Sequence, residues 1–503
     1  MIDKPLSPAL ATRHVDAVVI GAGLGGLLSA AQLLQRGKGV LVLERLPHCG
    51  GRFTAKTFQG VQVSTGAVHM VPFGSSGVLA ATLRRLGVPH RFSDADVFGS
   101  FHVHGKQYQA RGLLGVFAFL GWRQSFWFTR LGYLIFFRPL PPQERSLPFN
   151  LWLERHINVK RNPQLLAFFE RIARFALSLE LHQVSTAEVI RTTKNMFLYG
   201  APAIVLGGCG EVTRALERSI RERNGEIQLA CEVLQILHED GQVCGVRLLH
   251  KASGEQETVC TNLVVSDIGP RATYGLLHNR KITQAQVLKQ QQRARQSQPL
   301  DSSGEAAEES DLALQEAIGL KVHVLSDISL IPHRGIMYCL DTKRIAGIVQ
   351  PTNSDPSLAP AGKHLLISHQ VIQSSSLAEE KALALADLRT LFGDAFDTHC
   401  RVLTMGTYRG EWPVNRIAQG EDTSPTTAVR GLYLVGDAVK PSGYLMVEGL
   451  AQSVNCLLDL LDGLEREQSG GTVREHRSNM VSPSSRLNAL RWLWKAPGNA
   501  GKV

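Results

Sequence analysis

The amino-acid sequence predicts an α/β fold in which a parallel sheet is assembled from separated segments and joined to a second domain of the α+β class. Three observations lead to this prediction. With 503 residues, the chain exceeds what one hydrophobic core usually supports. A short β-branched run near the N-terminus passes directly into glycines and then into a run with helical spacing. A second buried-strand pattern, Leu432–Val435, ends in glycine and aspartate near the other end of the chain.

The N-terminal unit has the order of features that a dinucleotide-binding βαβ unit requires. A strand-like run, Val15–Ile20, is followed by the glycines Gly21, Gly23 and Gly26 and by a helical run, Leu27–Leu34. A second strand-like run, Gly39–Leu43, then ends in the acid Glu44. Gly21 allows a tight turn, Gly23 lets the backbone approach a pyrophosphate, and Gly26 lets the helix pack closely on the sheet. The helix N-terminus offers N–H groups to phosphate, and Glu44 stands where a carboxylate binds ribose. We therefore favour a dinucleotide site over a glycine-rich turn without a ligand.

Strand and helix patterns divide the rest of the chain. They assign residues 14–75, 201–275 and 425–465 to a nucleotide-binding domain. Residues 76–200 and 276–424 form the predicted substrate-binding domain, and residues 466–503 form a basic amphipathic tail. Short strand-like runs with an Asp240-Gly241 hairpin turn characterise the middle of the nucleotide-binding domain. The Gln-rich and then acidic composition of residues 284–310 predicts a flexible insertion.

The formal net charge of +10 is concentrated in two segments. Six basic residues occur with one acid from His104 to Arg145, and again from Gly471 to Val503. Both segments are rich in large apolar side chains, and arginines interrupt the first too often for a spanning helix. Cationic, aromatic-bearing amphipathic segments favour the surface of an anionic membrane. The alternatives are a buried helical pair in the first segment and a disordered basic end in the second. No nucleic-acid motif accompanies the charge, so nucleic acid is not an expected partner.

The eight cysteines are scattered and form no C-x-x-C pair. This spacing suits neither a zinc site nor a disulfide framework, and it favours a reducing compartment. His102 and His104 share one strand face without a third ligand, so we expect no metal site. The N-terminus lacks the apolar core of a signal peptide, and no apolar run reaches about eighteen residues. We expect a cytoplasmic protein that associates peripherally with a membrane.

Motifs outside the N-terminal unit match one superfamily. They are Glu44-Arg45, Gly50-Gly51-Arg52, the strand Val264–Asp267, and the strand Leu432–Val435 followed by Gly436-Asp437. Together with the N-terminal glycines, these motifs resemble the flavin-dependent amine oxidase/phytoene desaturase superfamily over most of residues 14–275 and 400–460. Within it, the chain looks most like the phytoene desaturase, carotene isomerase and retinol saturase branch. The resemblance implies a Rossmann-like, glutathione-reductase-like domain and FAD as the cofactor.

The resemblance also implies roles for particular residues. At the nucleotide end, the adenosine ribose would be bound by Glu44, the adenine by the backbone of Val233, and the pyrophosphate with its neighbouring ribose by Gly21, Gly23, Gly26 and Arg45. Gly51 and Arg52 would lie along the pyrophosphate and the flavin edge. Asp437, after Gly436, would hold the ribityl chain or the pyrophosphate. Glu448 and Gly449 would begin a helix whose N–H groups point at the flavin pyrimidine carbonyl. Such a helix start stabilises negative charge on reduced flavin. No catalytic residue beyond the flavin is assigned.

The activity that the resemblance implies is hydride transfer between flavin N5 and a C–C bond of an isoprenoid or carotenoid-like lipid. Only one dinucleotide fingerprint is present, so a membrane quinone or oxygen is the expected electron acceptor. Ser64 replaces a frequent family acid, and Lys440–Tyr444 departs from the Pro-Gly-x-Gly of desaturases, which leaves the substrate open. The alternatives are a carotenoid cis–trans isomerase, a porphyrinogen-type or amine oxidase, and a non-enzymatic prenyl-lipid chaperone of the GDP-dissociation-inhibitor type. Gly436-Asp437 in place of Gly-Glu argues against an amine substrate.

Overall fold

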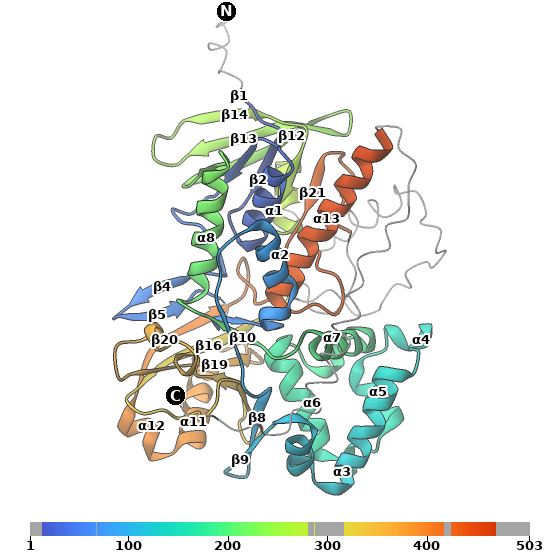
Figure 1. Ribbon diagram of the computed structural model, residues 1–503, viewed down its shortest axis with the longest axis vertical. Coiled ribbons are helices and arrows are strands. Elements are labelled where there is room, and N and C mark those ends of the chain that lie inside the picture. The colour runs from blue at the N-terminus through green and yellow to red at the C-terminus, as the bar shows by residue number, and fades with distance from the viewer. Residues whose placement is uncertain (1–12, 67, 280–285, 287–315, 417–423, 469–503) are drawn as a thin grey trace, which may run out of the picture.

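The computed structural model describes residues 13–66, 68–279, 286, 316–416 and 424–468. These residues form two halves: one contains a parallel sheet, and the other combines a mixed sheet with a group of helices (Figure 1). The predicted insertion at 284–310, apart from residue 286, lies outside the described residues, as does the tail after Gln468.

A five-stranded parallel sheet forms the centre of the first half. Its strand order is β11-β3-β2-β15-β21. The strands come from three separated parts of the chain: β2 (Ala17–Ile20) and β3 (Val40–Leu43); β11 (Glu226–Gln228) and β15 (Val264–Ser266); β21 (Leu432–Leu434). Val19 points into the core on one face of the sheet, and Val18 points into the core on the other. Because both faces are covered, these strands read as continuous apolar runs in the sequence.

Helices cover one face of this sheet, and a second sheet covers the other. The helices are α1 (Leu24–Gln35), α2 (Val78–Leu86), α8 (Cys209–Glu222) and α13 (Met446–Gln468). The opposite layer contains β1 (Arg13–His14), β12 (Cys231–Glu239), β13 (Gln242–His250), β14 (Gln256–Cys260) and α9 (Pro270–His278). The predicted hairpin turn at Asp240-Gly241 joins β12 to β13. Helix α2 packs in this half, although residues 76–200 were assigned to the substrate-binding domain.

A seven-stranded sheet forms the centre of the second half. Its order is β20 (Cys400–Tyr408), β16 (Gly319–Ser326), β19 (His364–Val371), β18 (Ile345–Val349), β17 (Ile336–Cys339), β8 (Gly99–Val103) and β9 (Lys106–Gln109). Helices α11 (Leu377–Phe392) and α12 (Asp394–His399) pack on one face, against Leu320, Val322 and Val324. Side chains alternate along a strand, so Lys321 and His323 project from the opposite face.

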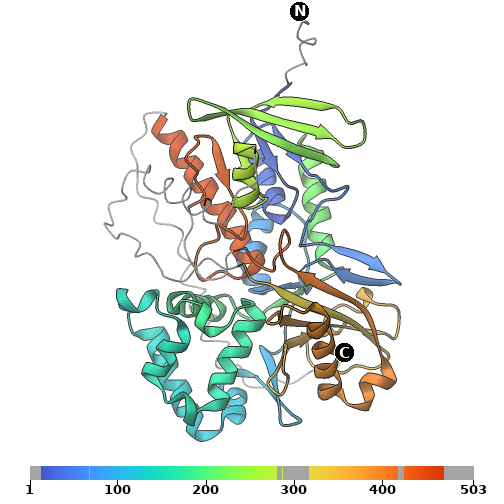
Figure 2. The same cartoon turned by 180° about the vertical axis from the view of Figure 1, so that it is seen from behind.

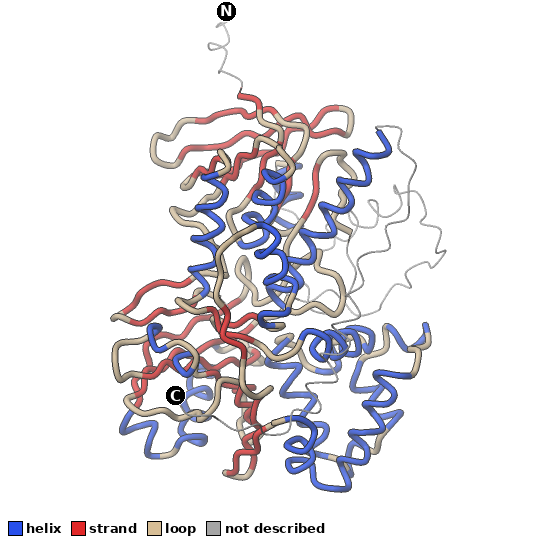
Figure 3. Tube along the Cα trace, viewed as in Figure 1, coloured by secondary structure: helices blue, strands red, loops and turns tan. Residues whose placement is uncertain are grey.

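A group of helices lies beside this sheet and gives the second half its helical side (Figures 2 and 3). The helices are α3 (Gly112–Phe137), α4 (Pro142–Arg145), α5 (Phe149–His156), α6 (Pro163–Ala176) and α7 (Thr186–Tyr199). Gly121, at φ 68° and ψ 166°, breaks α3 into two helical pieces. Two small sheets complete the fold: β4 (Ala55–Phe58) with β5 (Val61–Ser64), and β6 (Met70–Val71) with β10 (Ala203–Val205) and β7 (Phe92–Asp94).

Candidate functional site: a cavity between the two halves

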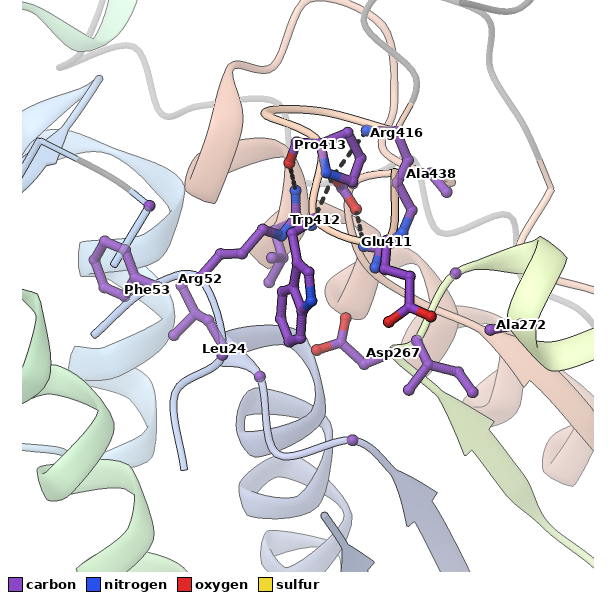
Figure 4. A pocket seen from close by; sticks show the side chains of 18 of the residues that line it. Leu24, Arg52, Phe53, Asp267, Ala272, Glu411, Trp412, Pro413, Arg416 and Ala438 are labelled. Carbon is purple, nitrogen blue, oxygen red and sulfur yellow. Dashed lines mark hydrogen bonds and ion pairs between the residues drawn. The ribbon is translucent and has the colours of Figure 1, made fainter. Parts of the chain in front are cut away.

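A cavity of about 880 Å³ opens at the carboxyl ends of the parallel strands (Figure 4). The loops after β2, β3, β15 and β21 form one wall, and β16 and β20 of the second sheet contribute to the other. This end of a parallel sheet is where ligands bind in open α/β folds, and the volume is that of a small-molecule or cofactor site. Eight residues predicted to bind the cofactor line it: Gly21, Gly23, Glu44, Arg45, Gly51, Arg52, Val233 and Asp437.

The glycine loop is held by the backbone. The Gly21 N–H donates to the Leu43 carbonyl at 2.8 Å, and φ of +97° at Gly21 makes the turn that glycine accommodates without strain. Gly26 does not line the cavity. A Cβ there would collide with the Gly21 carbonyl oxygen, so glycine at this position lets α1 pack directly on the end of β2. Gly26 therefore allows the close packing of helix on sheet that the sequence predicts for it.

Glu44 and Arg45 lie together at the end of β3. The Glu44 carboxylate accepts hydrogen bonds from the N–H groups of Ala22 (2.7 Å) and Leu46 (2.8 Å), so its position is fixed. Arg45 is half-exposed and forms an ion pair with Glu411 at 3.0 Å, with its guanidinium 5.4 Å from the centre of the Trp412 ring. These contacts join the two walls of the cavity at one place.

Arg52 and Asp437 form the centre of a buried charge network. Arg52 donates to Asp437 at 2.8 Å and to the carbonyl of Pro413 at 2.7 Å (Figure 4). Arg416 donates to Asp437 through its guanidinium at 3.0 Å and through its backbone N–H at 2.9 Å. The two guanidinium groups hold the pKa of Asp437 well below its usual range, against the opposing effect of burial. Asp437 is therefore ionised at neutral pH.

The start of α13 corrects one part of the predicted site. The N–H groups of Glu448 and Gly449 both donate to the Leu445 carbonyl, at 2.9 and 3.2 Å, so neither is directed into the cavity. The Glu448 carboxylate is fully buried and accepts from the backbone N–H of Leu79 at 2.8 Å, which ties α13 to the first turn of α2. The residues of α13 that line the cavity are Met446, Val447 and Leu450, on either side of Glu448 and Gly449.

Gly436 also lies outside the cavity lining. Its N–H donates to the Ser453 hydroxyl at 3.0 Å, which fixes the turn after β21 against α13. A Cβ at Gly436 would lie 2.6 Å from a carboxyl oxygen of Asp267. Glycine is thus needed at position 436 because the Asp267 carboxyl group, rather than the cofactor, packs closely against it.

Two titratable residues in the cavity wall, Lys321 and Asp267, were not predicted as site residues. The Lys321 ammonium lies 4.7 Å from the centre of the Tyr408 ring and forms no hydrogen bond or ion pair with the described residues. Burial lowers the pKa of Lys321 to about 7, and burial raises the pKa of Asp267 to about 7. Polar, titratable residues at alternate positions of an otherwise apolar strand, as in β16, are the signal that could have identified Lys321.

Ser64 explains one departure from the family pattern. Its hydroxyl lies 3.1 Å from Nε2 of His323, and Nδ1 of the same ring lies 3.1 Å from the Thr404 hydroxyl. Burial and the neighbouring Lys321 lower the pKa of His323 to about 3, so the imidazole is neutral. A neutral ring between two hydroxyls needs no acid at position 64.

The loop Lys440–Tyr444, the second departure, is anchored to the helical side of the protein. The buried carboxylate of Glu188, in α7, accepts from the Ser442 hydroxyl and the Gly443 N–H, both at 2.6 Å, and lies 3.5 Å from the Lys440 ammonium. This network fixes the segment that leads into α13. The unusual sequence of the loop therefore has a structural role next to the cavity.

Comparison with known proteins agrees with this architecture. The NAD(P)-binding Rossmann-like domain family matches residues 19–86. The uncharacterized protein MJ1488 of Methanocaldococcus jannaschii is 31% identical over 448 residues, which cover 89% of this chain and 99% of that protein. Prolycopene isomerase of Daucus carota is 25% identical over 509 residues, covering 86% of this chain and 77% of that one. The crystal structure of an oxidoreductase from Methanosarcina mazei has a TM-score of 0.76 and 30% identity, and covers 88% of this chain and 100% of that chain.

The fold, the cavity and these relatives define the class: an oxidoreductase with a Rossmann-like nucleotide-binding domain. The chain belongs to the flavin-dependent amine oxidase/phytoene desaturase superfamily, whose members are typically FAD-dependent. The predicted fold class and the prediction of an enzyme are confirmed.

Proposed function

We propose that the protein binds FAD and transfers hydride between the flavin and a C–C bond of an isoprenoid or carotenoid-like lipid. The observation that carries this proposal is the cavity, which gathers predicted cofactor residues from Gly21 to Asp437 on one wall. Bound FAD supplies N5 as the hydride acceptor or donor. A membrane quinone or oxygen is the proposed electron acceptor.

The residues present fit FAD in chemical type. Gly23 and Gly51 line the cavity next to the N-terminal turn of α1, which suits a diphosphate. Glu44 is fixed where it can accept from ribose hydroxyls. Arg52 and Asp437 offer a charged donor and an acceptor for the diphosphate and ribityl groups.

The opposite wall supplies an acid–base group. Lys321 has no ion-pair partner among the described residues and has a pKa of about 7, so near neutral pH its Nζ can accept or donate a proton. The Lys321 Nζ lies over the face of the Tyr408 ring, 4.7 Å from its centre. We propose that Lys321 takes up the proton that accompanies hydride removal from the lipid. Desaturation then removes one hydride and one proton and leaves a C=C bond.

Redox-neutral cis–trans isomerisation is the second candidate reaction. The similarity to prolycopene isomerase, which extends over 77% of that protein, favours it. A porphyrinogen-type or amine oxidase remains the alternative outside lipid chemistry. Product analysis separates these reactions, because an isomerase leaves the number of C=C bonds unchanged.

The first test is the cofactor. The purified protein should be yellow and absorb near about 450 nm, and FAD should be released on denaturation. Arg52→Ala should lose most of the flavin, whereas Arg36→Ala, which removes an exposed ion pair with Asp462 on the outer helix layer, should retain it. A colourless protein that does not take up FAD would contradict the proposal.

The second test is the substrate. Expression in a carotenoid-producing host should change the pigment profile, and the Arg52→Ala variant should abolish the change. A shift in double-bond number indicates desaturation or saturation, and a shift in geometry alone indicates isomerisation. An unchanged isoprenoid profile would count against the lipid assignment.

Helix α3 supports peripheral membrane association of the enzyme. Trp122 is 84% exposed, Leu114 82% and Phe137 75%, while Phe119 and Leu131, one in each helical piece of α3, are buried. Arginines accompany these exposed side chains, and apolar and cationic groups together favour an anionic membrane surface. No helix among the described residues is long and apolar enough to cross a membrane.

Vesicle flotation tests this association. The full-length protein should float with anionic vesicles more than with neutral ones, and a Trp122→Ser/Phe126→Ser variant should bind less. Phe58→Ser removes an exposed aromatic side chain outside α3 and serves as the control. Deletion after Gly471 measures the contribution of the tail. Equal flotation of all variants would contradict a role for α3.

A further inference from the structure

Asp267 occupies the junction of three loops in the cofactor cavity. It follows β15, the strand between β2 and β21, so it lies between the glycine loop after β2 and the Gly436-Asp437 turn after β21. Its backbone N–H donates to the Ile20 carbonyl at 2.9 Å. Its carboxyl group faces the cavity, as Figure 4 shows. No binding role is assigned to this residue by the motifs of the sequence.

The carboxyl group of Asp267 fills the space that Gly23, Gly25 and Gly436 leave. A Cβ at Gly25 would lie 2.5 Å from Oδ1, and one at Gly23 would lie 2.6 Å from Oδ2. The Gly26 N–H donates to Oδ2 at 3.0 Å. A carboxyl group therefore already lies at the N-terminal turn of α1, where a dinucleotide diphosphate is expected to bind.

The positively charged groups near Asp267 form ion pairs with the neighbouring carboxylate, Asp437. Arg52, from the loop after β3, and Arg416, from the loop after β20, both donate to Asp437. Asp437 itself, from the turn after β21, disfavours a second negative charge beside it, and helix α1 contributes only the Gly26 N–H. Burial is the largest cause of the raised pKa of Asp267, about 7, and the two arginines oppose it. The paired carboxyls thus differ: Asp437 is ionised, and Asp267 takes the proton.

We propose that Asp267 contacts the diphosphate of FAD as a neutral carboxylic acid, so that cofactor binding takes up one proton from solvent. A carboxylate beside a diphosphate would repel it, whereas the protonated group donates its O–H to a phosphate oxygen. The proton bonds to a carboxyl oxygen of Asp267, and no other bond changes. The inference rests on the proposed FAD cofactor and concerns affinity for it.

The experiment measures FAD affinity of the full-length apoprotein by flavin fluorescence quenching from pH 6 to pH 9. The wild-type Kd should rise by up to about tenfold per pH unit above the pKa of Asp267. Asp267→Asn keeps an acceptor for Gly26 and a donor for phosphate at every pH, so its slope should be lower by close to one unit of log Kd per pH unit. Any slope that remains in this variant reports other groups, including Lys321.

Asp462→Asn is the matched control. It removes the same charge from a side chain paired with Arg36, away from the cavity, and should keep the wild-type slope. Calorimetry of wild-type protein at pH 8.5 in buffers of different ionisation enthalpy should show uptake of close to one proton, and this result does not depend on folding of a variant. Equal slopes for wild type and Asp267→Asn, or no proton uptake, would overturn the role of Asp267. Failure to bind FAD at any pH would overturn the cofactor as well.

Discussion

The two walls of the cavity are built by different chemistry. The wall from the parallel sheet presents backbone at Gly21, Gly23 and Gly51, beside the first turn of α1 and next to the ion pair of Arg52 with Asp437. Below it is called the backbone wall. The wall from the seven-stranded sheet presents buried side chains, Lys321 and Tyr408. The first wall is suited to recognise phosphate and ribose groups that are common to many dinucleotides. The second wall contributes Lys321, whose pKa of about 7 suits the proton transfer proposed above.

This difference indicates how substitutions in each wall should affect the protein. Substitutions on the backbone wall act through steric collision and loss of cofactor binding. Substitutions on the opposite wall remove charge or hydrogen bonds while the sheet itself is retained. Each prediction below perturbs one wall, or the contacts that join them, with an expected size that follows from this distinction.

The largest effect is expected from Gly26→Ala, directly behind the backbone wall, where α1 packs on the end of β2. The new Cβ would collide with the Gly21 carbonyl, and backbone has little freedom to move away. We expect a loss of about 3 kcal/mol in the free energy of unfolding, measured by urea denaturation, and loss of retained flavin. Gly463→Ala in α13 is the control, because nothing lies within 4 Å of its Cβ, and it should stabilise the protein by about 0.5–1 kcal/mol. Equal stability of the two variants would contradict close packing at Gly26.

Arg52→Ala should have the next largest effect. It leaves Asp437 with Arg416 as its remaining cationic partner, and loss of a charged hydrogen bond at a buried site costs about 2 kcal/mol. The folded-state pKa of Asp437 is depressed, so its stabilisation is present above the unfolded pKa and is lost as pH falls through the folded pKa. The variant raises that folded pKa. Its acid unfolding, followed by circular dichroism, should therefore begin at higher pH than that of the wild type; an identical midpoint would contradict this charge network.

Lys321→Met tests the opposite wall. The folded pKa of Lys321, about 7, is below its usual 10.5, so the unfolded chain binds more protons between these values. Wild-type stability should thus gain up to about 1.4 kcal/mol per pH unit over this range from this residue, and the variant should lack that gain. Lys363→Met, which removes an exposed lysine, is the control. Denaturant titrations at pH 7, 8 and 9 measure the slope, and parallel slopes in all three proteins would contradict a neutral buried lysine.

The backbone wall could be predicted from sequence because its features are contiguous. Strand, glycines, helix and acid follow one another within residues 15–44, and geometry is set by neighbours along the chain. Gly436-Asp437 was also identified, since it ends a buried strand. These motifs predicted eight of the residues that line the cavity.

The opposite wall depends on pairings that the sequence does not display. Lys321 reaches the cavity because β16 pairs with β19 and β20, which begin more than forty and eighty residues later, and because α11 covers the other face. The sequence assigns Glu448 to the flavin site, but its carboxylate accepts from the backbone N–H groups of Phe73 and Leu79, which are 375 and 369 residues away in sequence. The direction of a buried carboxylate is decided by such distant donors, so position at a helix start was insufficient to predict it.

The smallest effect is expected where the two walls meet. Arg45 and Glu411 are both substantially exposed, with side-chain exposures of 43% and 73%, so solvent screens their ion pair. A double-mutant cycle of Arg45→Ala and Glu411→Ala should give a coupling energy of about 0.5 kcal/mol or less in stability. The same contact crosses the cavity edge, so each single variant should release FAD up to about fivefold faster in stopped-flow exchange. A coupling energy above about 2 kcal/mol would contradict this prediction, because it would show that Arg45 and Glu411 join the two walls through a strong contact.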